Sequence, residues 1–138
     1  WMSNNGSPMM KYNFATGALE THSTPGRPEN VWFRETEYVP ELDMLLCASR
    51  VTGPDGQPGN LAYDIAAGKW IGIAMPCTDG KPRTNDQQYA LISLALAYDP
   101  TFKVVVYLSQ TQEVLVARLD RATIKTFQPR MQPASKKG

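Results

Sequence analysis

An internal repeat constrains this chain more than any other feature of its sequence. Residues 38–49 (YVPELDMLLCAS) align without a gap on residues 98–109 (YDPTFKVVVYLS), at an offset of 60. The Tyr, Pro and Ser positions are identical, and in both copies a turn precedes an apolar run. Because repeated sequence at this spacing is typical of repeated supersecondary units, the chain is expected to contain related units.

A second, shorter element occurs three times. Segments 12–17 (YNFATG), 63–68 (YDIAAG) and 119–124 (LDRATI) follow one another at offsets of 51 and 56. The offset of 56 is smaller than 60 because the loop at 52–59 (TGPDGQPG) is longer than its counterpart, and insertions in repeat arrays fall in loops. The two elements together predict four strands in each unit.

The fold class expected from this pattern is all-β. Short apolar segments are separated by clusters of Gly, Pro and Asp, and no segment keeps helical spacing over three turns. The predicted strands span residues 9–14, 18–21, 32–38, 44–49, 60–64, 70–74, 91–98, 104–109, 114–120 and 124–127. Most of the 11 prolines and 10 glycines lie between these segments, where they favour turns.

One segment carries a family resemblance. Residues 60–70 (NLAYDIAAGKW) resemble the kelch repeat, in which Tyr-Asp closes a third strand and a short turn leads to a Trp on the fourth. The resemblance covers residues 9–127, with Ala48-Ser49 and Leu108-Ser109 in place of the kelch Gly-Gly doublet. It implies antiparallel four-stranded blades of a kelch-like or galactose-oxidase-like β-propeller. The alternative is a ten-stranded sandwich or barrel, which requires only alternation and turns.

The resemblance implies about two and a half blades. We expect a flexible end at 1–8, the outer strands of a preceding blade at 9–29, blades at 30–80 and 81–128, and a polar tail at 129–138. Propellers typically close with four to eight blades, so the ring would be completed by copies of this chain or by the rest of a parent protein. The start at Trp1 rather than Met suggests a piece of a longer protein.

Structural roles are expected for the residues that recur at equivalent positions. The aromatic and apolar side chains at strand ends are expected to be buried between blades: Tyr12, Tyr38, Tyr63, Trp70, Tyr98 and Leu119. Asn13, Asp64 and Asp120 are expected to hydrogen-bond the backbone of the turns that they open.

A candidate ligand site lies on the predicted innermost strand of the 30–80 unit. Arg34, Glu35 and Glu37 would face the central channel of a propeller, where they could bind a small molecule or a carbohydrate. The alternative is that these polar side chains alternate along a solvated strand and bind nothing.

No catalytic residue, metal or cofactor is predicted. His22 is the single histidine, so the chain cannot supply the histidine pair with which galactose-oxidase-like enzymes bind copper. Carboxylates at Glu35, Glu37, Glu41 and Asp43 could form an acid–base pair, but such clusters beside turns are usually solvated.

The cysteine count leaves the compartment open. Cys47 and Cys77 are too few for a disulfide scaffold, and Cys47 is expected to be a buried thiol; whether the two are bonded stays undecided. An extracytoplasmic or secreted location is slightly favoured.

Charge and hydropathy narrow the class of partner. A net charge of +1 gives no electrostatic footprint for nucleic acid, and the longest apolar run, 90–97, is too short to span a membrane. The expected function is a non-catalytic binding and assembly scaffold. The alternatives are a segment of a larger secreted enzyme acting on carbohydrate, with its catalytic residues elsewhere, and a self-contained β-sandwich binding module.

Overall fold

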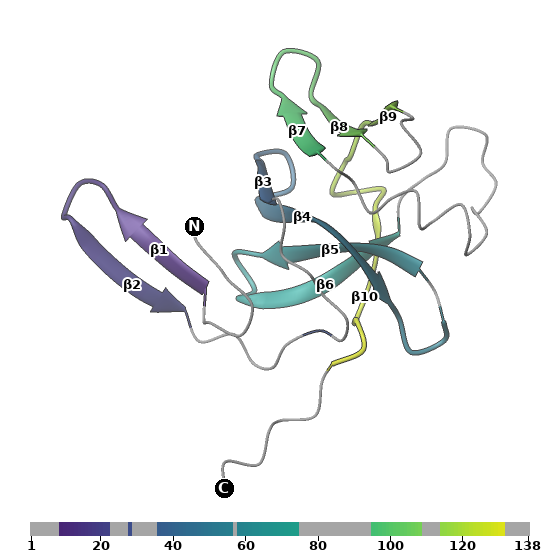
Figure 1. Cartoon of the computed structure of the whole chain (residues 1–138), viewed down its shortest axis with the longest axis horizontal. Coiled ribbons are helices and arrows are strands. Elements are labelled where there is room, and N and C mark those ends of the chain that lie inside the picture. Colours follow the sequence, from purple (N-terminus) through teal and green to yellow (C-terminus); the bar gives the residue numbers. More distant parts are fainter. Residues whose placement is uncertain are drawn as a thin grey trace, which may run out of the picture.

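The described part of the chain consists of strands and turns. The computed structural model describes residues 9–22, 28, 36–56, 58–74, 95–108 and 114–131, and no helix occurs among them. Ten antiparallel strands form a hairpin, a five-stranded sheet and a three-stranded sheet (Figure 1). Each strand overlaps one of the segments expected from the sequence, which confirms the all-β prediction. These described strands close neither a barrel nor a propeller ring.

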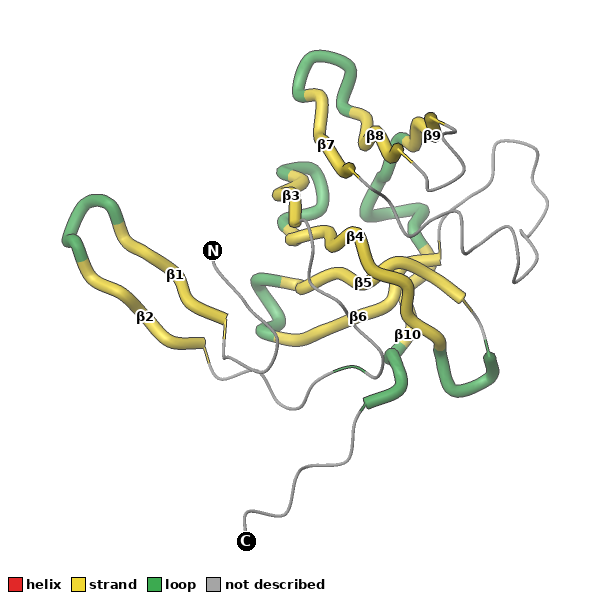
Figure 2. Tube along the Cα trace, viewed as in Figure 1, coloured by secondary structure: helices red, strands yellow, loops and turns green. Residues whose placement is uncertain are grey.

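The five-stranded sheet is built on a meander of four consecutive strands. These are β3 (Thr36–Val39), β4 (Met44–Thr52), β5 (Pro58–Asp64) and β6 (Lys69–Ala74). Strand β10 (Lys125–Phe127) pairs beyond β6, giving the order β10-β6-β5-β4-β3 (Figure 2). Strand β4 continues past its predicted end at residue 49 and β5 starts before residue 60, so the insertion forms part of a longer hairpin.

The three-stranded sheet contains β7 (Ala95–Asp99), β8 (Val104–Leu108) and β9 (Val114–Ala117). Its expected fourth strand, residues 124–127, instead pairs with the first sheet, with Phe127 opposite Gly72. The ring of Phe127 lies over Gly72 and Gly59, where a Cβ on either glycine would be within 3 Å of the ring. The space left by these two glycines is therefore the physical reason for the different pairing.

The 60-residue repeat is retained in the backbone of two hairpins. Val39 pairs with Met44 in β3–β4, and Asp99 pairs with Val104 in β7–β8. Both turns end on a residue with positive φ, which is 51° at Asp43 and 54° at its repeat partner Lys103. A positive φ is uncommon outside glycine, so its occurrence at both equivalent positions shows that the two turns share one conformation.

The shorter element forms the turns predicted for it. Asparagine and aspartate side chains accept hydrogen bonds from backbone N–H groups, with Ala15 N to Asn13 Oδ1 at 3.0 Å, Ala67 N to Asp64 Oδ1 at 3.0 Å, and Ala122 N to Asp120 Oδ1 at 2.8 Å. Gly17 and Gly68 end the first two turns at φ of 70° and 63°. The turn at Asp120 differs, because β9 has already ended at Ala117 and the chain then crosses to β6.

The two sheets stack in the same sense. We call the side of a sheet that carries Leu46 and Ala48, or their repeat partners Val106 and Leu108, its forward face, and the opposite side its rear face. The forward face of the first sheet packs against the rear face of the second. This core comprises Val39, Leu42, Met44, Leu46, Ala48, Ala62, Ile71, Ile73, Leu96, Val105, Tyr107 and Leu119. The rear face of the first sheet is buried as a second cluster, comprising Leu45, Cys47, Val51, Leu61, Tyr63 and Trp70.

The hairpin of β1 (Met9–Asn13) and β2 (Ala18–His22) projects from the sheets (Figure 1). Its cross-strand pair Tyr12 and Leu19 corresponds, at an offset of 51, to the pair Tyr63 and Trp70 in β5–β6. Tyr63 and Trp70 are 1% and 4% exposed, whereas Tyr12 and Leu19 are 43% and 53% exposed. The equivalent cross-strand pairs are therefore buried in β5–β6 and exposed in β1–β2.

Burial of the recurring side chains is thus confirmed for Tyr63, Trp70 and Leu119 and is wrong for Tyr12 and Tyr38. Tyr98 is only half-buried and packs against the core cluster between the sheets. Tyr12 is exposed because the five- and three-stranded sheets lie away from its hairpin. Tyr38 lies on the edge strand β3 and donates its hydroxyl to Asp43 Oδ1 at 3.1 Å.

The start of the expected polar tail packs against the first sheet. Arg130 N donates to the Thr52 carbonyl at 2.9 Å, and its guanidinium donates to the Pro54 carbonyl at 3.2 Å. The preceding Pro129 is fully buried. The segments 1–8 and 132–138 lie outside the described residues.

Candidate functional site

The structure places only one of the three predicted ligand-site residues. Arg34 and Glu35 lie outside the described residues. Glu37 is half-buried on β3, opposite Leu46 on the forward face of the first sheet. The described residues therefore do not bring the predicted trio together.

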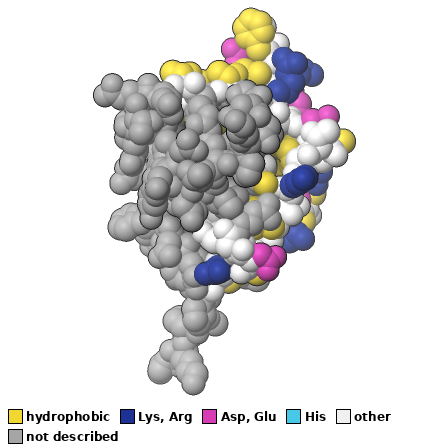
Figure 3. All heavy atoms as spheres, turned by 90° about the vertical axis from the view of Figure 1, so that its right-hand side faces the viewer, with side chains coloured by type: hydrophobic (Ala, Val, Ile, Leu, Met, Phe, Trp, Pro, Cys, Tyr) yellow, Lys and Arg dark blue, Asp and Glu magenta, His cyan; other side chains and the backbone are white. Residues whose placement is uncertain are grey.

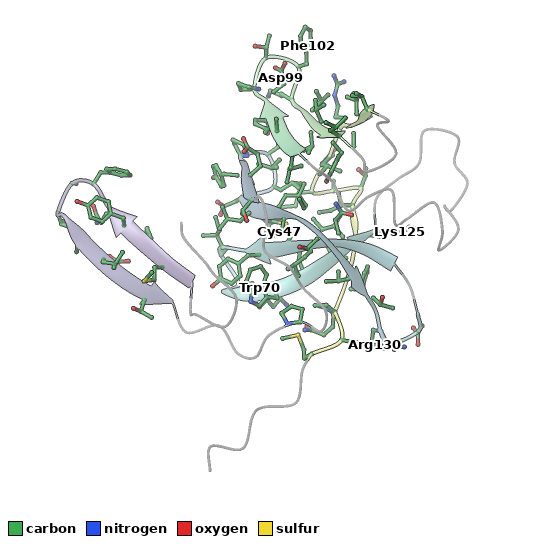
Figure 4. The ribbon with its side chains drawn as sticks, in the orientation of Figure 1. Cys47, Trp70, Asp99, Phe102, Lys125 and Arg130 are labelled. Carbon is green, nitrogen blue, oxygen red and sulfur yellow. The ribbon has the colours of Figure 1, made fainter. Side chains whose placement is uncertain are left out.

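A cleft with both apolar and charged lining residues lies elsewhere, between the β3–β4 turn and the segments around the β7–β8 turn. Its volume is about 610 Å³, and it is lined by Glu41, Thr101, Phe102, Lys103, Arg118, Leu119 and Asp120. Asp99 shapes one wall, because its carboxylate accepts hydrogen bonds from Thr101 N at 2.8 Å and Phe102 N at 3.1 Å. Phe102 lies at the tip of this hairpin (Figure 4) and is 66% exposed. The cleft thus combines one exposed aromatic ring with charges of both signs.

The Glu41 carboxylate in the cleft contacts two other side chains. The Tyr98 hydroxyl donates to Glu41 Oε2, and Lys103 Nζ lies 3.7 Å from Glu41 Oε1. The hydrogen bond from Tyr98, with a smaller effect of Lys103, lowers the pKa of Glu41. Desolvation and the same hydrogen bond raise the pKa of Tyr98 to about 12. Tyr98 therefore remains a neutral donor, and Glu41 an anion, at physiological pH.

The arginines near the cleft are held by backbone carbonyls. Arg118 donates to the Phe102 carbonyl at 3.1 Å. The Arg121 guanidinium donates to the backbone carbonyl of the buried Leu42 at 2.6 Å. It also lies 3.4 Å from Asp64 Oδ2. Because Arg121 follows the second sheet and both of its partners belong to the first, this contact joins the two sheets.

The described residues contain no group of three or more His, Cys, Asp or Glu side chains arranged to bind a metal ion. Cys47 is a free thiol inside the first sheet (Figure 4), and burial raises its pKa to about 12, so it is not a nucleophile at neutral pH. Of the carboxylates predicted to pair, Glu41 is bonded to Tyr98 and Asp43 to Tyr38.

A second surface of note is the forward face of the three-stranded sheet. Cross-strand pairs place Val106 beside Val116 and Leu108 beside Val114 on this side. Val114 is 64% exposed, Val116 51% and Leu108 37%. In the first sheet the equivalent positions, Leu46 and Ala48, are buried in the core cluster that also contains Leu96 of β7 and Tyr107 of β8. On the face of the molecule drawn in Figure 3, exposed hydrophobic side chains lie beside side chains of both charges.

Neither surface is predicted by the sequence pattern of strands and turns. The cleft depends on contacts between segments far apart in the chain, although the repeat does place its two turns at equivalent positions. The open face could have been found from the strand alternation of residues 106–116, since valine and leucine occur on both sides of those strands.

No protein-family model, curated protein or solved structure matches this chain. Among the residues that the structure describes, no helix has the length and apolar character needed to cross a membrane.

Proposed function

We propose that the chain is a non-catalytic binding and assembly scaffold, a kelch-like propeller segment whose stack of sheets is continued by another polypeptide chain. The observation that carries the proposal is the open forward face of the three-stranded sheet. Contiguous apolar side chains on a surface are typical of interaction sites. In the first sheet the equivalent face is covered by a second sheet, so a β-sheet is the partner that the architecture favours.

The polar framework between the sheets supports a scaffold role. Arg121 joins the turn after β9 to the Leu42 turn, and the Glu41 contacts with Tyr98 and Lys103 bridge the tips of the two hairpins. These contacts join the second sheet to the first, in addition to the apolar core between them. Packing of the two sheets before a partner binds would lower the entropic cost of docking.

Light scattering on the isolated chain tests this proposal. The expected result is a mass above the 15.3 kDa of the monomer that falls as the protein is diluted. Replacing Val114 by glutamate should shift the equilibrium toward monomer, because a charge would be buried at the contact. A well-folded chain that stays monomeric at every concentration contradicts the proposal.

A small carbohydrate is a second candidate ligand, favoured by the cleft. The exposed ring of Phe102 could stack on a sugar, while Glu41, Asp120 and Arg118 could hydrogen-bond its hydroxyls. NMR titration with mono- and disaccharides is the test. Shifts confined to the cleft residues and reduced by Phe102→Ala support this candidate, and unchanged spectra contradict it.

A further inference from the structure

Two exposed apolar surfaces of the described residues have features of the two sides of one contact. One is the forward face of β8–β9, with Val106, Leu108, Val114 and Val116. The other is the side of the β1–β2 hairpin that carries Tyr12 and Leu19. These two surfaces are compared below as possible partners in a contact between chains.

The repeat assigns the hairpin side to a rear face. At an offset of 51, Tyr12 and Leu19 correspond to Tyr63 and Trp70, which belong to the rear-face cluster of the first sheet. The opposite side of the hairpin carries the cross-strand pair Lys11 and Glu20. The hairpin is thus amphipathic. Its apolar side is equivalent, by the repeat, to the rear face of the first sheet.

Within the chain, a rear face packs on a forward face. Val105 and Tyr107, on the rear of the second sheet, belong to the same core cluster as Leu46 and Ala48 on the forward face of the first sheet. The rear face of the first sheet is already buried, with Cys47 fully buried. Among the described strands, the exposed surface that is equivalent to a rear face is therefore the apolar side of the β1–β2 hairpin.

The hairpin does not cover the forward face of its own chain in this structure. Figure 1 shows β1–β2 on one side of the molecule and β8–β9 on the other, with the first sheet between them. The complementary hairpin would then come from a second copy. The side chains named on the two surfaces are all uncharged, so packing these side chains together buries no charge among them.

We propose that copies of this chain associate head to tail, with the apolar side of the β1–β2 hairpin of one copy packed on the forward face of β8–β9 of the next. This inference rests on the proposed scaffold function and names its partner. The contact is heterologous, because different surfaces of the two copies meet. Such contacts generate rings when the rotation closes and open chains when it does not.

A complementation experiment tests the proposal. Leu19→Glu blocks the hairpin, and Val116→Glu blocks the forward face, so each variant alone should be monomeric by light scattering. Mixed in equal amounts, they should form a one-to-one dimer of twice the 15.3 kDa monomer, because each retains the surface that the other has lost. The dimer should not grow further, since its remaining surfaces are both blocked.

Matched controls keep charge and folding constant. Ala18→Glu adds the same charge to the opposite side of the hairpin, and Gln128→Glu adds it at an exposed site away from both surfaces; both should assemble like the unmodified chain. Circular dichroism and the denaturation midpoint establish that each variant is folded. If Val116→Glu does not fold, Val114→Glu replaces it, because Val114 is the more exposed side chain.

The outcomes separate this inference from the scaffold proposal. If the unmodified chain assembles but the mixed variants stay monomeric, head-to-tail contact is wrong and the scaffold proposal stands. An assembly that stops at a dimer and is lost on Val116→Glu but not Leu19→Glu indicates two forward faces packed together, which also overturns the inference. A monomeric unmodified chain overturns both proposals.

Discussion

Replacing Gly72 by alanine is expected to destabilise the chain, and truncating Phe127 is expected to remove that cost. A Cβ on Gly72 would meet three carbons of the Phe127 ring, the farthest of them at 2.8 Å. Real Cβ atoms do not approach other atoms this closely, so the ring must move. Because Phe127 lies on β10, movement of the ring weakens the strand that ties the second sheet back to the first.

The magnitude follows from overpacking and partial burial. Inserting a methyl group into a packed contact costs about 1–3 kcal/mol, so we expect about 2 kcal/mol for Gly72→Ala. Phe127 is only partly buried, so Phe127→Ala should cost less than the 3–5 kcal/mol of a core phenylalanine, about 2 kcal/mol. With Phe127 absent, Gly72→Ala should be neutral or stabilising by about 0.5 kcal/mol, since alanine loses less backbone entropy than glycine. The expected coupling is therefore about 2 kcal/mol.

Urea denaturation of the two single variants and the double variant measures this coupling, provided that the slope of the transition is constant. Two other glycines serve as controls. Gly59→Ala should remain destabilising without Phe127, because its Cβ would also lie 2.5 Å from the Ile73 carbonyl oxygen. Gly56→Ala should cost the same in both backgrounds, since its site is open and only its φ of 78° is strained. An equal cost of Gly72→Ala with and without Phe127 would refute the reasoning.

Three further predictions concern single side chains. Asn60→Leu is expected to lower the free energy of unfolding by about 1–3 kcal/mol in urea denaturation, because it removes the side chain that hydrogen-bonds the fully buried Tyr107 hydroxyl; unchanged or higher stability contradicts this. The pKa of Glu41 is lowered from its ordinary value of 4.5 by Tyr98, so its stabilisation is present above that value and lost as the pH falls through the lower, folded-state pKa. Glu41→Gln should therefore flatten the acid limb of the stability profile, and an unchanged profile refutes that role. In a Cys77→Ser background, Cys47 should not react with a thiol reagent until the protein unfolds, because burial raises its pKa to about 12; rapid labelling of the native protein would show that the thiol is accessible.

Local chemistry made much of the fold predictable. The turn at Asn13 depends on hydrogen bonds within three residues, and the hairpins of Asp43 and Lys103 depend on alternation and a four-residue turn. The repeat made these turns recognisable because the same short-range pattern recurs. Burial of Trp70 and of the Cys47 thiol followed from apolar strands flanked by turns.

The candidate surfaces were not predictable in the same way. Arg34, Glu35 and Glu37 were identified by their place on a predicted strand, and the structure describes only Glu37. The cleft forms because Tyr98 and Lys103 meet Glu41 across two hairpins that are 60 residues apart in the repeat. No local pattern encodes such a meeting, since it depends on how the two sheets stack.

The sequence by itself determined the strands, the turns and the repeated order of their faces, because these depend on backbone preferences and hydrogen bonds between near neighbours. Only the tertiary structure decided which strands became partners. The Phe127 ring packs over Gly72 and Gly59 of the first sheet rather than within its own repeat unit. Tyr12 is exposed, whereas its equivalent Tyr63 is buried. Those outcomes depend on packing between distant segments, and they leave the two complementary apolar surfaces on which the proposed assembly depends.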